Sequence, residues 1–141
     1  MKNTDNITLL IVGCEESKKI YGIIMNHLMI GAISGCLVVI MGAFGSHALN
    51  ETLDDYGKSI YNKAVLYHMF HSIALLILGL INTIQPEISL SISGWSFLFG
   101  IILFSGSLYI LAITGIKSLG IITPIGGVLF IIGWVFLIIK V

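Results

Sequence analysis

Charged residues interrupt the hydrophobic positions of this chain at few places. The long uncharged stretches cover residues 20–50, 64–86, 88–116 and 118–139. Each is longer than the roughly 20 apolar residues that cross the hydrocarbon core of a bilayer as a helix. The pattern therefore predicts four transmembrane helices, at about residues 27–46, 58–82, 93–114 and 119–140.

Polar residues predict where two of these helices begin. Asp54 and Asp55 are candidate N-caps of the second helix, because a carboxylate there accepts unpaired backbone N–H groups. Thr123 followed by Pro124 has the pattern of an N-cap and a first helical residue. The fourth helix can therefore start at Pro124, after a short apolar segment at 119–122. The alternative is a kinked helix from about residue 118.

The composition supports a membrane protein. Hydrophobic residues make up 57% of the 141 residues, charged residues 10%, and the mean hydropathy is +1.04. An ordinary soluble domain carries about 25% charged residues, so a water-soluble fold is excluded. Nucleic-acid binding is excluded too, because the net charge is zero and no basic patch exists. We expect an all-α membrane protein, a four-transmembrane-helix bundle surrounded by the lipid bilayer.

The chain divides into two parts. Residues 1–24 form a polar N-terminal leader, and residues 25–141 form the four-helix transmembrane domain. Met25 is an alternative translation start, in which case the leader is not native. Four spans place both ends of the chain on one side, with four lysines there and three on the other. The positive-inside rule therefore gives almost no preferred orientation.

Glycines recur along the predicted helices at helical spacings. Those of the first span fall on one helical face, and small residues there let helix backbones approach closely in lipid. We therefore expect a helix-packing role, with no chemistry, for Gly31, Gly35, Gly42, Gly45, Gly100, Gly126, Gly127 and Gly133.

Four short segments carry a family resemblance. They are GAFGSHAL at 42–49, YHMFHSIAL at 67–75, FSGSLY at 104–109, and ITPIGG at 122–127 followed by Gly133 and Trp134. In this order they resemble the domain of unknown function 423 family, small bacterial inner-membrane proteins that include the animal transmembrane protein 256.

The resemblance covers about residues 27–140 and implies four transmembrane helices in a bacterial cytoplasmic (inner) membrane. It also implies an uncharacterised molecular function, with no catalytic or binding residues to transfer. The family pattern usually has Gln where this chain has His68, which weighs against a special role for that histidine.

The candidate chemistry lies in a few polar residues at membrane depth. Ionisable groups there are functional candidates because their burial is costly. Adjacent antiparallel helices could bring His47 near Tyr67 or His71. The sequence therefore predicts a polar cluster formed by His47, Tyr67, His71, Ser105, Ser107, Tyr109 and Thr123.

Three interpretations of these residues compete. The first is a non-enzymatic protein in which His47 and His71 tie helices together by hydrogen bonds. The second is a proton or small-solute permeation protein whose path is lined by His47, His71, Ser105 and Ser107, since histidine exchanges protons near neutral pH. The third is haem or metal binding by His47 with His68 or His71.

Enzymatic activity is the weakest interpretation, because no acid in the spans can orient a catalytic histidine. We expect no catalytic residue, no metal site and no cofactor. Protein partners and the oligomeric state are unassigned.

Overall fold

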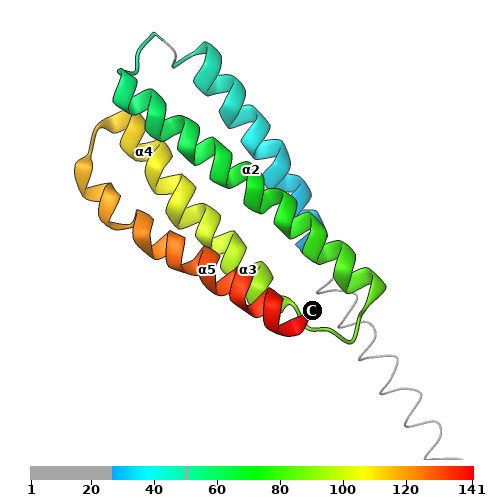
Figure 1. The fold of residues 1–141 in the computed structure, drawn as a ribbon. Helices are drawn as coiled ribbons and strands as arrows, with labels where there is room; N and C mark the ends of the chain where they lie inside the picture. The colour runs from blue at the N-terminus through cyan, green and yellow to red at the C-terminus, as the bar shows by residue number, and fades with distance from the viewer. Residues whose placement is uncertain (1–26, 50) are drawn as a thin grey trace, which may run out of the picture.

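The computed structural model describes residues 27–49 and 51–141, so the predicted leader lies outside the described part. Four antiparallel helical segments lie side by side as a bundle (Figure 1). They cover His27–His47, Asp55–Ile84, Ser91–Thr114 and Lys117–Lys140, and each is long and apolar enough to cross a membrane. The predicted all-α four-helix fold is therefore confirmed.

Helix α2 (Asp55–Ile84) begins at a side-chain cap. The Asp54 carboxylate accepts the backbone N–H of Gly57 at 2.7 Å. The helix ends one residue before Gln85, and Pro86 follows, which disfavours helical backbone in the residue before it. With 30 residues, α2 is about 45 Å long, so its charged first turns extend beyond a bilayer core of about 30 Å.

We expect Asp54→Ala to lower the free energy of unfolding in detergent by about 1 kcal/mol, because the N-cap bond is lost. Asp54→Asn retains a capping oxygen and should stay near wild type. Asp55→Ala is the matched control, since Asp55 is exposed and caps nothing. An equal loss in the Asp55 variant would mean that charge, not the cap, is responsible.

The third span contains a wider turn. It consists of α3 (Ser91–Gly100), the π-helical segment η1 (Ile101–Ser105) and α4 (Gly106–Thr114). The N–H of Gly106 bonds to the carbonyl of Ile101, five residues back instead of four. The span ends at Gly115, whose φ of 70° is the left-handed conformation common after a helix.

The fourth span starts with the 3-10 segment η2 (Lys117–Ile121), and α5 follows (Thr123–Lys140). The predicted N-cap role of Thr123 is wrong. Ile122 occupies the cap position in helical conformation and makes no side-chain cap bond. The Thr123 hydroxyl instead bonds the Ser107 hydroxyl across the helix interface at 2.8 Å.

Two apolar clusters hold the bundle together, and polar residues of α2 separate them. One cluster packs α2 against α4 around Tyr61 and Ala64. The other packs α2 against α3, η1 and α5 around Leu75, Leu78 and Phe97. The buried polar residues His68, His71 and Ser72 lie between the two clusters along α2, near the middle of that helix.

Several of the predicted packing glycines lie against a neighbouring helix. A Cβ atom on Gly31 would lie 2.8 Å from the backbone nitrogen of Leu76, and one on Gly126 would overlap the backbone of Phe104. Aromatic rings cover three more, namely Gly45, Gly100 and Gly133.

The remaining predicted glycines approach the neighbouring helices less closely. A Cβ atom on Gly42 or Gly127 would make an ordinary contact at 3.7 or 3.8 Å. Gly35 has no such atom within 4 Å, so it does not share a packing face with Gly31. Gly79, which sequence spacing did not single out, approaches Leu28 as closely as Gly31 approaches Leu76.

Candidate functional site

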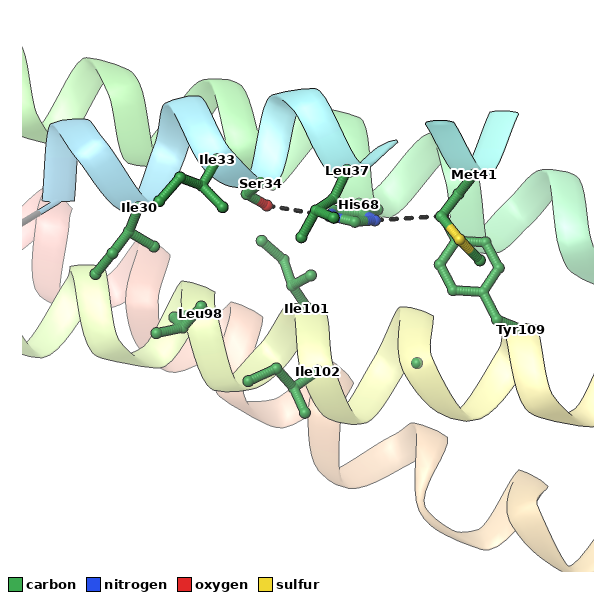
Figure 2. A pocket seen from close by; sticks show the side chains of 11 residues that line it. Ile30, Ile33, Ser34, Leu37, Met41, His68, Leu98, Ile101, Ile102 and Tyr109 are labelled. Carbon is green, nitrogen blue, oxygen red and sulfur yellow. Dashed lines mark hydrogen bonds between the residues drawn. The ribbon is translucent and has the colours of Figure 1, made fainter. Parts of the chain in front are cut away.

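A hydrogen-bonded chain centred on His68 joins three spans. The Nε2 atom of His68 lies 3.0 Å from the Ser34 hydroxyl of the first span, and Nδ1 lies 3.3 Å from the Tyr109 hydroxyl of α4. Figure 2 shows these two bonds following one another along the direction of the helices. Ser34 also lies 2.7 Å from the Ser72 hydroxyl of α2.

The direction of this chain follows from counting hydrogens. The Ser72 hydroxyl donates its one hydrogen to the His68 carbonyl at 2.7 Å. Ser34 must therefore donate to Ser72, and it accepts from the Nε2–H group of His68. Nδ1 of the neutral ring is then the acceptor for the Tyr109 hydroxyl. Each hydroxyl and ring N–H in the chain is used once as a donor.

His71 occupies a separate site against α5. Its Nδ1–H group donates to the Tyr67 carbonyl at 2.8 Å, and its Nε2 accepts from the Trp134 indole at 3.3 Å. The ring stacks on Phe130 with centroids 3.5 Å apart and an interplanar angle of 6°. His71 is thus a buried, neutral histidine whose two nitrogens both have partners.

The other predicted cluster residues are dispersed. Ser107 bonds the Phe104 carbonyl and the Thr123 hydroxyl. Ser105 is fully buried in the π-helical turn, and its hydroxyl has no hydrogen-bond partner within the described residues. Of the seven predicted residues, Tyr67 thus stacks on His71, Ser107 pairs with Thr123, and Tyr109 bonds His68.

The expected approach of His47 to Tyr67 or His71 does not occur. His47 is exposed at the end of the first span, beyond Gly45, which packs on the ring of Tyr61. Tyr61 precedes His71 by ten residues, or about 15 Å of helix. The register of the antiparallel helices therefore separates His47 from both His68 and His71.

The sequence pattern does not predict three residues of the site. The family resemblance gives His68 no special role, and the predicted polar cluster does not include Ser34 or Ser72. One signal was present, because His68 and Ser72 are four residues apart and so share a helix face. No such signal marks Ser34, whose nearest hydroxyl neighbour in the same apolar helix is Ser46, twelve residues away.

A groove of about 520 Å³ lies between the first span and the third, with the His68 chain at its base (Figure 2). Ile33 and Ile102 are 55% and 53% exposed at its rim. The groove is therefore reached from the surface that would face lipid. The lining residues are Ile30, Ile33, Ser34, Leu37, Met41, His68, Leu98, Ile101, Ile102, Gly106 and Tyr109.

Metal ligation has little support among the residues described. In 27–49 and 51–141, no three His, Cys, Asp or Glu side chains gather where they could hold an ion. The predicted pairing of His47 with His68 or His71 would also need a different helix register.

Comparison with known proteins places the chain among membrane proteins without an assigned activity. Residues 41–127 match the family described as "Protein of unknown function (DUF423)". A "UPF0382 membrane protein" of Staphylococcus epidermidis is 49% identical over 113 residues, covering 80% of this chain and 92% of the relative. The "UPF0382 membrane protein YwdK" of Bacillus subtilis is 42% identical over 114 residues, covering 80% and 93%. No solved structure shows a significant match.

Together with the four apolar helices, these relatives confirm that the chain is an integral membrane protein, and the relatives are bacterial.

Proposed function

Because this chain belongs to the DUF423 family, whose description names no activity, we propose its role from its own polar contacts. It is a non-enzymatic integral membrane protein whose buried histidines hold the helices in one register. The observation that carries this proposal is that both ring nitrogens of His68 and of His71 are hydrogen-bonded. Such bonds are individually modest in membranes, at about 0.6 kcal/mol on average, but they select one helix arrangement.

The geometry at Ser34 and His68 argues against a serine nucleophile. A catalytic histidine takes the proton of the serine, and an acid on its other nitrogen orients it. Here the hydrogen count makes His68 the donor and Ser34 the acceptor. The other nitrogen faces the Tyr109 hydroxyl, which is no carboxylate.

One observation favours proton permeation as a second candidate. The chain from Tyr109 through His68 and Ser34 to Ser72 could in principle pass a proton along successive hydrogen bonds. His68 would then carry the path in place of the predicted pair His47 and His71. Beyond Ser72, however, α2 continues with Leu75 and Leu78, both with 0% exposure in an apolar cluster. These residues close the path with side chains that cannot carry a proton.

A measurement of proton flux distinguishes the structural role from proton permeation. We expect proteoliposomes containing the full chain and a pH-sensitive dye to dissipate a pH gradient no faster than empty vesicles, with a protonophore added last as the positive control. Proteoliposomes containing His68→Leu should also show no proton flux above that of empty vesicles. Flux in the wild type that disappears in His68→Leu but persists in His47→Ala would replace the structural role by the permeation role.

A further inference from the structure

We propose that the groove between the first and third spans binds a neutral long-chain lipid that carries a hydroxyl group, with the hydroxyl directed at the Ser34–His68–Tyr109 chain. This goes beyond the structural role of the histidines, because it gives the same residues a ligand.

The depth of the Ser34–His68–Tyr109 hydrogen-bonded chain in the membrane restricts the charge of the ligand's head group. His68 lies about 20 Å from the start of α2 and about 24 Å from its end, and its partner Ser34 lies about 10 Å inside the first span. Phospholipid head groups are charged or zwitterionic and stay at the interface, because moving a charge to the bilayer centre is costly. A ligand whose polar group reaches this depth inside the apolar spans must therefore be neutral.

The lining fits a hydrocarbon tail. Seven of the residues around the groove are Ile, Leu or Met, and they come from the first span, α3 and η1. Figure 2 shows the side chains of Ile30, Ile33 and Leu37 facing those of Leu98, Ile101 and Ile102 across it. An isoprenoid or acyl chain can lie there while its end contacts Ser34 or Tyr109, which lie on opposite sides of the His68 ring.

The hydrogen-bond inventory selects the polar group. In the chain deduced above, the hydrogens of Ser34 and Tyr109 are already donated, whereas each hydroxyl oxygen can accept one more bond. Ser34 and Tyr109 are only 6% and 7% exposed, so the small polar surface at the base of the groove consists of acceptors with no unused donor. A hydroxyl group can donate to it, whereas an ether or a ketone cannot.

The third span borders the groove at its irregular turn. The π-helical turn η1 lies along it, and such turns occur frequently at functional sites. Gly106, which follows the turn, lines the groove, and a Cβ atom there would meet nothing within 4 Å. A side chain at position 106 would therefore enter the groove without displacing backbone.

The experiment uses the purified full chain in nanodiscs, with the isoprenoid alcohol geranylgeraniol and its methyl ether as probes. We expect the alcohol to bind the wild type about fivefold more tightly than the ether, the value of one ordinary hydrogen bond. Tyr109→Phe with Ser34→Ala should remove most of this preference. Gly106→Leu should weaken binding of both probes at least tenfold. Gly35→Leu is the matched control, because Gly35 also has open space but lies outside the groove.

Three results would overturn the proposal. Equal binding of alcohol and ether would remove the hydroxyl assignment. Unchanged binding to Gly106→Leu would place the ligand elsewhere. A change of oligomeric state in Gly106→Leu, seen by native mass spectrometry without any probe, would make the groove an interface between copies of this chain. Because these outcomes concern binding and not proton flux, they are independent of the test of the structural role.

Discussion

Replacing Gly126 with alanine is expected to lower the free energy of unfolding by about 2 kcal/mol, although alanine is the better helix former by about 1 kcal/mol. The added methyl group would overlap the backbone of Phe104 and lie 2.7 Å from its Cβ atom. Backbone cannot rotate away as a flexible side chain can. The two helices must therefore separate, and the contacts of Phe104 with Tyr67 and Phe130 would loosen.

The measurement is reversible unfolding in mixed detergent micelles, followed by tryptophan fluorescence. Gly35→Ala is the control with the opposite expected sign, a gain of about 1 kcal/mol, because its new methyl group meets no atom within 4 Å. If both variants gained stability, helix propensity and not packing would decide the effect.

His68→Leu is expected to lower the free energy of unfolding by about 2–3 kcal/mol, the second large effect in this chain. Leucine fills a similar volume but leaves Ser34 and the Tyr109 hydroxyl without their imidazole partner. Unpaired polar groups at membrane depth have no water to replace that partner.

His68→Gln distinguishes the hydrogen bonds from the volume. The glutamine amide offers one donor to Ser34 and one acceptor to Tyr109, as the neutral imidazole does. We expect its loss to stay below about 1 kcal/mol. Met69→Leu, at an exposed position of the same helix, serves as the background substitution. Leucine and glutamine variants of equal stability would show that the hydrogen-bonded chain contributes nothing measurable.

The sequence was sufficient to predict the spans but not their rotation. Charged residues cannot enter the bilayer core, so their positions mark the helix ends directly, as Asp54 does for α2. The rotation of each helix about its own axis is not marked in this way, because α2 is apolar on its exposed side as well as on its buried side. Leu66 and Phe70 are 56% and 55% exposed, whereas Leu75 is 0% exposed. Hydrophobicity alone could not show that His68 faces the first span and α4 while His71 faces α5.

Register explains the remaining errors at the site. The order of the spans predicts that the helices of His47 and His71 are adjacent and antiparallel. It does not predict which residues of the two helices lie opposite each other. The close contact of Gly31 with Leu76 and the bond from Ser34 to Ser72 fix that alignment. From the sequence alone, Ser34 is indistinguishable from a small residue that only permits helix packing. The pattern Thr123-Pro124 predicts a local cap, whereas the Thr123 hydroxyl bonds to another helix.

The scarcity of charge in the spans has a consequence for energy coupling. A transmembrane voltage does work on a protein only by moving charge through the field, about 2.3 kcal/mol per elementary charge per 100 mV. Between Lys63 and Pro86, and throughout Ser91–Thr114, this chain carries no Asp, Glu, Lys or Arg, and its two mid-span histidines are held neutral by their hydrogen bonds. These two stretches therefore supply no ionised side chain that a transmembrane voltage could move within the bilayer core.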